Sequence, residues 1–121
     1  FSGVMAILAG LGSAAVYRLK HTQTRLSRAS RAEWEALSEL MAHKSSYKEY
    51  RAALAAQRRI PPFVPYIGVH LTDLTFLGDG NPNEIDGQLN YSKRQHAAAI
   101  ISLCLSGRAA RYGFRALPGV A

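Results

Sequence analysis

Three prolines within five residues divide this chain into two parts that cannot be joined by one helix. Pro61, Pro62 and Pro65 lack a backbone N–H, and each restricts the residue before it to extended conformations. The segment around them must therefore be extended, and it must end any helix that precedes it. The segments on both sides carry apolar residues at helical spacing. We therefore expect an all-α fold in which a stiff connection leads into the last helices.

Two short helices are predicted at the start of the chain. Residues 2–11 are uncharged and apolar up to Gly10, and residues 13–19 follow with Ser13 as the candidate N-cap. The basic and hydroxyl-rich residues 21–28 are expected to form a loop or a frayed helix end. The uncharged start is too short and too rich in small residues for a membrane span, and it lacks the basic region of a signal peptide. A buried helix is the better interpretation.

Two longer helices with apolar stripes are predicted next. Ser30 and Glu33 match a capping box that opens a helix ending near residue 42, and Ser45 is the candidate cap of a helix ending near residue 57. The stripes, at spacings of three and four residues, are Trp34, Leu37 and Met41 in the first helix and Tyr47, Tyr50 and Leu54 in the second. We expect both stripes to belong to the core rather than to a ligand site.

The part of the chain behind the prolines predicts a hairpin of two helices over about residues 66–105. The first helix of the hairpin is expected over about residues 66–77. At about 100° per residue, three polar side chains share one narrow face of this helix and of its C-terminal end: Thr72, Thr75 and Asp79. The opposite face suits packing against the second helix and holds Ile67, His70, Leu71, Leu74 and Leu77. Val69 and Phe76 flank the polar face and are expected to offer apolar surface to a partner.

The rest of the hairpin is expected to be a loop and a second helix. Residues 78–87 are rich in turn-forming residues, and Asn90 or Ser92 caps the helix that follows. Residues 107–121, with scattered glycine and arginine, are expected to form a loose C-terminal tail. The predicted domain therefore covers residues 1–106.

The charge of the chain is strongly basic but unevenly distributed. A formal net charge of +7 permits nucleic acid, an anionic membrane or an acidic protein as partner. Residues 18–31 hold five basic side chains and no acidic one, whereas residues 60–92 hold four acidic side chains and neither lysine nor arginine. No zinc finger or aromatic-basic signature accompanies the basic segment, so we expect no nucleic-acid partner. The predicted hairpin is thus locally acidic on a basic chain.

Several short blocks occur in the order and spacing of one protein family. They are Val64-Pro65-Tyr66-Ile67-Gly68, Leu71-Thr72-Asp73-Leu74, Gly80-Asn81-Pro82 and Asn90-Tyr91-Ser92-Lys93-Arg94, preceded by matching segments at residues 1–11 and 15–19. Together they resemble the catalytic domain of Ras-type guanine-nucleotide exchange factors (RasGEF). Because independent blocks are in register over about residues 1–105, the resemblance is far more specific than one short motif. It covers roughly the C-terminal half of such a domain.

The resemblance implies a non-covalent activity on a small GTPase. In this family the first hairpin helix enters the GTPase between switch one and the nucleotide, displaces switch one and disturbs the magnesium and phosphate sites, so that GDP leaves. The implied partner is a GTPase of the Ras, Rap or Ral type. No cofactor is implied for the factor itself, because nucleotide and magnesium belong to the GTPase. The resemblance and the single cysteine, Cys104, agree with a cytoplasmic protein recruited to the inner face of the plasma membrane.

Specific residues acquire roles through this resemblance. The inserting residues would be Thr72, Thr75, Asp79 and Asn81. Further contacts with the GTPase would come from Tyr47, Val69 and Phe76, of which Tyr47 matches an aromatic residue that contacts switch two. The hairpin would be positioned by Pro62, Pro65, Gly68, Asn90 and Arg94. A carboxylate on the inserting face would repel phosphates and compete for the contacts that hold magnesium.

Two departures from the family pattern keep a second interpretation open. Thr75 stands where some members have a bulky aliphatic residue, and Asp79 stands where the longer glutamate is common. The alternative is a module of the same fold that binds a GTPase or another protein without promoting exchange. The basic residues 18–31 additionally suggest a weak attraction to the anionic inner leaflet.

Other functional classes have little support in the sequence. Asp79, Asn81 and Asn83 mimic the start of a calcium-binding loop, but Glu84 occupies the position that requires glycine and Asn90 the position that requires glutamate. The four histidines show no metal-ligand spacing, and one cysteine cannot form an intrachain disulfide. No nucleophile elbow accompanies the serines. We therefore expect neither a metal site nor a hydrolase.

Overall fold

Helices dominate the protein, and the all-α class predicted from the sequence is confirmed. The computed structural model describes residues 1–115. The elements in chain order are α1 (Ser2–Leu11), α2 (Ala14–Tyr17), α3 (Lys20–Thr24), α4 (Arg28–Leu40), α5 (Lys48–Gln57), α6 (Ile67–Gly80), β1 (Glu84–Ile85), β2 (Gln88–Leu89), α7 (Tyr91–Ser106) and the 3₁₀ turn η1 (Gly107–Ala109). Residues 116–121 of the predicted tail lie outside the described residues.

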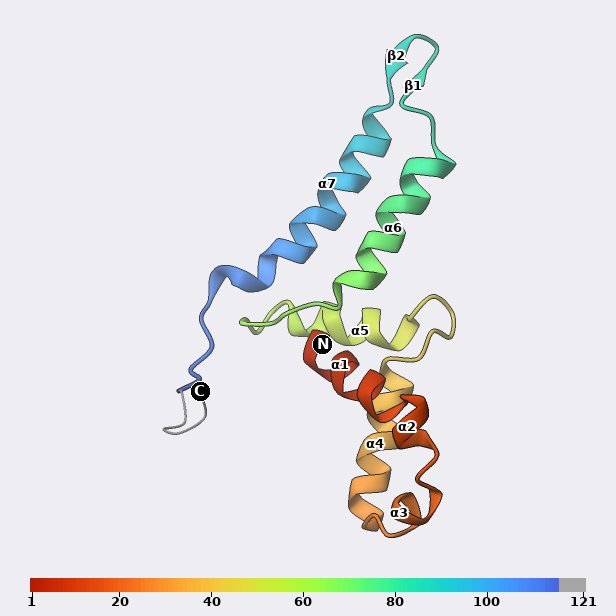
Figure 1. Ribbon diagram of the computed structural model, residues 1–121. Helices are drawn as coiled ribbons and strands as arrows, with labels where there is room; N and C mark the ends of the chain where they lie inside the picture. Colours follow the sequence, from red (N-terminus) through yellow and green to blue (C-terminus); the bar gives the residue numbers. More distant parts are fainter. Residues whose placement is uncertain (116–121) are drawn as a thin grey trace.

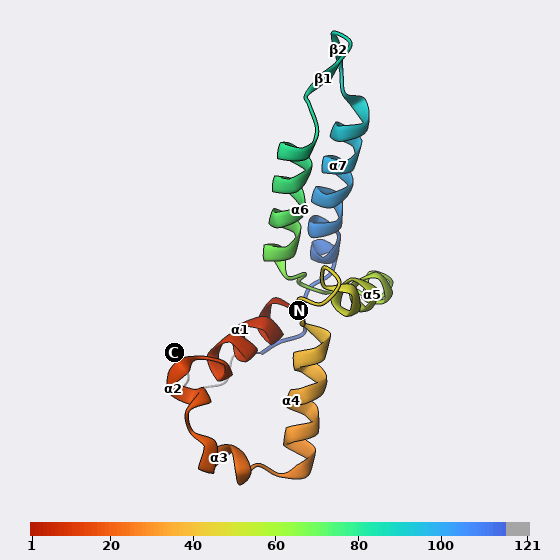
Figure 2. The same ribbon diagram turned by 90° about the vertical axis from the view of Figure 1, so that its right-hand side faces the viewer.

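The helices form a body and a long projection from it. Helices α6 and α7 lie side by side and point away from the other helices, with the β1–β2 ribbon at their far end (Figures 1 and 2). Helix α5 crosses the base of this projection, and α3 lies at the opposite end of the molecule (Figure 1). The predicted hairpin therefore exists as a protruding pair of helices that reaches well beyond the body.

A small core lies where α5, the proline segment and the base of α6 meet. Its buried hydrophobic members are Met41, Tyr50, Leu54, Phe63 and Val69. Apolar side chains of α1 pack against this cluster. The two stripes predicted in α4 and α5 thus contribute to the core as expected, although Leu37 is 37% exposed. The core holds the base of the hairpin and leaves its outer length without support from the body.

The predicted starts of α4 and α5 are both wrong by a few residues. Ser27, not Ser30, caps α4: its Oγ accepts a hydrogen bond of 3.0 Å from the backbone N–H of Ser30. Ser30 occupies the first turn, where its own hydroxyl contacts that of Ser27. Before α5, Ser45 and Tyr47 lie in a run of three residues with positive φ, so this stretch is a left-handed turn and the helix begins only at Lys48.

The connection of the hairpin is more regular than the predicted loop. Helix α6 continues beyond the predicted end to Gly80, and a two-stranded ribbon pairs Glu84 with Leu89. Asp86 and Gly87 both have positive φ, as the tight turn of a short hairpin requires. The prediction of a helix cap at Asn90 is confirmed, since its Oδ1 accepts from the N–H of Lys93 at 3.0 Å. The Asn90 amide also donates to the carbonyl of Pro82, which ties the ribbon to α7.

The packed part of the chain extends past the predicted boundary at residue 106. Gly107 is buried against the proline segment, and a side-chain carbon at this position would overlap the backbone oxygen of Phe63. The turn η1 follows directly, so residues 107–109 are not part of a free tail. Only a residue without a side chain allows α7 to end this close to Phe63.

Candidate functional site

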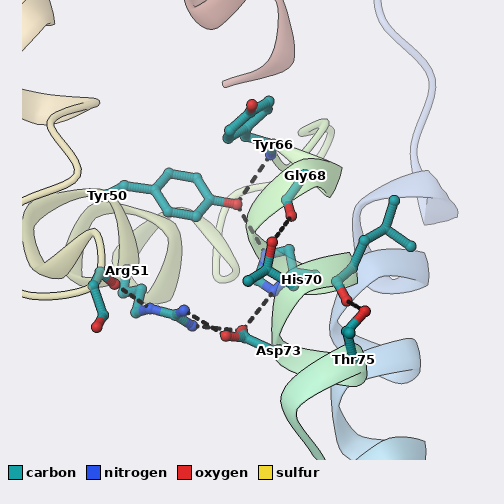
Figure 3. A network of polar contacts seen from close by, with 10 residues as sticks. Tyr50, Arg51, Tyr66, Gly68, His70, Asp73 and Thr75 are labelled. Carbon is teal, nitrogen blue, oxygen red and sulfur yellow. Dashed lines mark hydrogen bonds and ion pairs between the residues drawn. The ribbon is translucent and has the colours of Figure 1, made fainter. Parts of the chain in front are cut away.

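Three exposed polar side chains form one face of α6, which we call the inserting face: Thr72, Thr75 and Asp79. The hydroxyl of Thr72 donates to the carbonyl of Gly68 at 3.0 Å, and that of Thr75 donates to the carbonyl of Leu71 at 3.1 Å (Figure 3). Each hydroxyl therefore donates its hydrogen bond within its own helix, and its lone pairs remain available to accept from a partner. Among the ion pairs of residues 1–115, none involves the Asp79 carboxylate. The inserting face therefore consists of hydrogen-bond acceptors and carries one negative charge, that of the Asp79 carboxylate.

Asn81 and Lys93 close the end of α6. The Asn81 amide donates to the carbonyl of Leu77 at 3.2 Å. The Nζ of Lys93 donates to two backbone oxygens, those of Gly78 at 2.8 Å and of Asn81 at 2.5 Å. These oxygens lie at the helix C-terminus, where a cation is stabilising. Lys93 therefore fastens α7 to α6 near the tip, a role that the sequence reasoning missed.

The predicted positioning residues behave differently from one another. Asn90 is buried and caps α7, whereas Arg94 is exposed and makes only a backbone hydrogen bond, from its N–H to the Asn90 carbonyl. Pro65 is buried and Pro62 is half-buried at the base of the hairpin. The Ser2 hydroxyl donates to the carbonyl of Pro65 at 2.6 Å, so α1 holds the proline segment from the other side.

Gly68 allows Tyr66 to fold back over the first turn of α6. A side-chain carbon at Gly68 would come within 2.9 Å of the Tyr66 ring. The ring of Tyr66 also packs edge-on against that of Tyr47, with 6.3 Å between the centroids. The lack of a side chain at Gly68 thus allows the aromatic contact that joins the base of the hairpin to the turn before α5.

Of the three predicted apolar contacts, only Phe76 is fully available. Its side chain is 71% exposed, while Val69 is 3% exposed and belongs to the core. The prediction that Val69 offers surface to a partner is therefore wrong. Tyr47 is half-buried and packs against the rings of Tyr50 and His43.

The error at Val69 has a physical cause in how α6 is rotated. The sequence pattern places Leu71 and Ile67 on the packed side, but they are 57% and 40% exposed. The side turned toward the body carries Val69 and Asp73, together with His70, which the sequence pattern does place on the packed side. His70 and Asp73 on this side have polar partners on α5, Tyr50 and Arg51, which apolar periodicity cannot reveal.

A network of polar contacts joins α5 to α6 (Figure 3). The Tyr50 hydroxyl accepts a hydrogen bond of 3.0 Å from the N–H of Tyr66 and lies 2.9 Å from Nε2 of His70. One turn further along α6, the Asp73 carboxylate receives both guanidinium nitrogens of Arg51, at 2.9 and 2.8 Å. The Nε of Arg51 donates to the carbonyl of Ser46. Two neighbouring residues of α5 thus hold two residues of α6.

Burial and pairing shift the pKa values of these groups. Burial lowers the pKa of the His70 imidazole, against the opposing influence of Asp73. Burial likewise raises the pKa of the Tyr50 hydroxyl, and the hydrogen bond to Asp73 raises that of Arg51. At neutral pH the network therefore consists of a neutral Tyr–His pair beside a charged Arg–Asp pair.

Within residues 1–115, no group of three or more His, Cys, Asp or Glu side chains is placed to hold a metal ion. Cys104 is a free, half-buried thiol, and burial raises its pKa, which disfavours the reactive thiolate. None of the helices that the structure describes is both long and apolar enough to span a bilayer. The exposed face of α6 is the best-defined candidate site.

Comparison with known proteins identifies relatives along most of the chain. The family model of the RasGEF domain matches residues 1–95. Ras guanine nucleotide exchange factor J of Dictyostelium discoideum is 41% identical over 115 residues, 95% of this chain and 14% of that protein. Ras guanine nucleotide exchange factor B of the same organism is 41% identical over 95 residues, 78% of this chain and 6% of its own length. Ras-specific guanine nucleotide-releasing factor 2 of Rattus norvegicus is 36% identical over 102 residues, 84% of this chain and 8% of the relative.

Acidification is expected to loosen the base of the hairpin. In an opened or unfolded chain His70 binds a proton near the ordinary histidine pKa of about 6.5, whereas burial keeps its folded-state pKa lower. The stability that depends on neutral His70 is thus complete above about pH 6.5 and is lost as the pH falls toward the lower folded-state pKa. Hydrogen exchange of the α6 amides, corrected for the intrinsic effect of pH, should show easier opening at about pH 5.5 than at about pH 7.5.

The variant His70→Gln supplies the control for this pH dependence. Glutamine keeps an acceptor for the Tyr50 hydroxyl but does not titrate, so the difference between the two pH values should shrink. The charged groups that face the ring, Arg51 and Asp73, remain in place in this variant. Equal opening of α6 at both pH values in the unmodified protein would contradict the prediction.

Proposed function

The chain belongs to the RasGEF domain family, and we propose that it promotes the release of GDP from a Ras-family small GTPase. The observation that carries the proposal is the inserting face: an exposed row of acceptors with one carboxylate, on a helix that projects from the body. A projecting helix of this kind can enter a groove of another protein. The RasGEF relatives span the same hairpin, which supports the assignment of the partner class.

The proposed mechanism requires no covalent chemistry. An exchange factor accelerates release by binding the nucleotide-free GTPase more tightly than the GDP-bound one. Asp79, exposed at the distal end of α6, would bring negative charge toward the phosphates and the magnesium site, where it disfavours bound nucleotide. Thr72, Thr75 and Asn81 would supply the polar contacts that replace those of the nucleotide, and Phe76 would add apolar area beside them.

The position of the acidic face within the chain supports this mechanism. Residues 60–92 contain no lysine or arginine. The ammonium group of Lys93 is hydrogen-bonded to the carbonyls at the end of α6. Asp73 is neutralised by Arg51 at the base. The negative charge that remains free on α6 is therefore that of Asp79, near the tip.

A second candidate is a module that binds a GTPase without promoting exchange. It is favoured by the short side chains at Thr75 and Asp79, which reach less far than the aliphatic and glutamate residues common in the family. Such a module would bind the GTPase equally well with and without GDP. The rate of nucleotide release separates the two candidates, whereas a binding measurement alone does not.

We also propose a weak electrostatic contact of the opposite end of the molecule with an anionic membrane. The five basic side chains around α3 are exposed: Arg18, Lys20, Arg25, Arg28 and Arg31. Two exposed apolar residues of the same region, Tyr17 and Leu19, could enter the headgroup layer beside them. A membrane contact at this end would leave the hairpin free for a GTPase.

The first prediction concerns release of a fluorescent GDP analogue in the presence of excess GTP. The protein should accelerate release from one of the Ras, Rap and Ral GTPases. The double substitution Thr75→Ala with Asp79→Ala should remove most of this effect, on the order of tenfold or more, because it deletes the charge and the polar contact that act on the nucleotide site. The matched control is Glu39→Ala, which removes an exposed carboxylate of α4, outside the hairpin.

The outcomes of this measurement are distinct. Acceleration that survives the double substitution would remove the inserting face from the mechanism. Binding to a GTPase without acceleration of release would establish the non-catalytic module instead. Neither binding nor acceleration for any of the three GTPases would contradict both candidates.

The second prediction concerns vesicles with increasing fractions of anionic lipid. Binding should rise with the anionic fraction and weaken when Arg25 and Arg28 are both replaced by glutamine, since each basic residue near the surface contributes about 1 kcal/mol. Lys48→Gln, an exposed position on α5, is the matched control. Binding that does not depend on lipid charge would contradict the membrane contact.

A further inference from the structure

We propose that Tyr50 and Arg51 are positioning residues for nucleotide exchange, because together they hold the hairpin at the angle at which its inserting face meets the GTPase. This inference rests on the proposed function for its effect on exchange. Its structural part, that two contacts from α5 fix the direction of α6, can be tested without any GTPase. We call the two contacts the base clamp: Tyr50 with His70, and Arg51 with Asp73.

The first contact of the base clamp is buried. Tyr50 is 0% exposed and His70 is 2% exposed, so neither group can exchange its partner for water. The Tyr50 oxygen accepts from the Tyr66 N–H, which leaves its proton for Nε2 of His70. The His70 ring then carries its own proton on Nδ1, 3.7 Å from Oδ2 of Asp73. Loss of the hydroxyl would leave both an N–H group and a ring nitrogen unsatisfied.

The second contact of the base clamp is bidentate. A planar guanidinium that meets a carboxylate through two nitrogens fixes direction as well as distance. Arg51 is itself held, because its Nε donates to the carbonyl of Ser46 at 2.8 Å in the left-handed turn before α5. The pair is partly exposed, so its main effect is expected on orientation rather than on overall stability.

Two contacts one turn apart constrain α6 more than either contact alone. A single contact would leave the helix free to rotate about it, whereas His70 and Asp73 together define both the tilt and the rotation of the helix. On the helical wheel, at about 100° per residue, Thr72, Asp79 and Thr75 lie about 100°, 120° and 160° away from Asp73. With Asp73 held against α5, Thr72 and Thr75 are left exposed.

The other contacts of the hairpin with the body lie at its base. They are those of the small core, the ring contact between Tyr66 and Tyr47, the hydrogen bond from Ser2 to Pro65 and the end of α7. The outer length of the hairpin has no neighbour in the body (Figures 1 and 2). Lys93 and Asn90 join α6, the ribbon and α7 to one another, not to the body. The hairpin can therefore move as one piece about its base when the clamp is weakened.

The test measures hairpin direction and exchange in the same set of variants. Spin labels at two exposed positions, Ala52→Cys on α5 and Gln95→Cys on α7, report the distance between body and hairpin. The single native cysteine, Cys104, is replaced by serine in these variants. Asp73→Asn and Tyr50→Phe should broaden or shift this distance. They should also lower the maximal rate of GDP release about tenfold at saturating GTPase, because misplacement of the inserting face costs rate rather than affinity alone.

Rescue and control variants separate positioning from loss of fold. The charge exchange Arg51→Asp with Asp73→Arg should bring both the distance and the rate back toward the original values, and Arg51→Lys should retain part of both. Glu39→Gln breaks an exposed ion pair of 3.0 Å on the body and should change neither. Helix content by circular dichroism identifies any variant that has unfolded. If Asp73→Asn or Tyr50→Phe has unfolded, the distance and the release rate of Arg51→Lys are used to test the proposal instead.

The outcomes also distinguish the inference from the function on which it rests. If the distance distribution of Asp73→Asn and Arg51→Lys equals that of the unmodified protein, the base clamp does not set the direction of the hairpin. If the distance changes but the maximal release rate does not, the clamp does not position the hairpin for exchange. If the unmodified protein accelerates no release, the proposed function fails, while the distance measurement still decides whether the clamp fixes the hairpin.

Discussion

The buried hydroxyl of Tyr50 is the interaction on which the rest of the structure depends. It lies where α5, the proline segment and α6 meet, and it satisfies both the Tyr66 N–H and the His70 ring. The first N–H groups of a helix have no partner within that helix, so at the partly buried start of α6 the Tyr66 N–H takes its acceptor from elsewhere. The Tyr50 hydroxyl of α5 is this acceptor, and it thereby joins the two parts of the chain that the prolines separate.

A hairpin held at its base and free along its length fits a protein that acts by insertion. The contacts with the body orient the hairpin, and the free negative charge lies near its far end. The length of α6 separates the two (Figure 1). Arg51 neutralises Asp73 at the base, whereas Asp79 remains available near the tip. Chemistry of this kind needs no nucleophile or metal from the factor, because the work consists of stabilising one state of a partner over another.

Periodicity and turn chemistry predict much of this architecture, but not the contacts that orient it. The helical class, the stripe of Tyr50 and Leu54, the Asn90 cap and the polar face of α6 all follow from local spacing. The rotation of α6 does not, because it depends on hydrogen bonds between residues 20 and 22 positions apart across the prolines. Local spacing therefore places Val69 on the surface, and it gives no sign of the role of Lys93, whose partners are carbonyls 15 and 12 residues away. The roles of the site residues came from the family resemblance, which periodicity alone could not supply.

The most direct measurement uses a photo-crosslinking amino acid at Phe76, which is 71% exposed beside the inserting face. The protein is irradiated with a Ras-family GTPase, either loaded with GDP and magnesium or stripped of nucleotide, and the crosslinked peptides are identified. The account predicts crosslinks to the GTPase residues around the nucleotide site, much stronger in the nucleotide-free state than with GDP bound. Crosslinks of equal strength in both states, or on a GTPase surface remote from the nucleotide site, would contradict it.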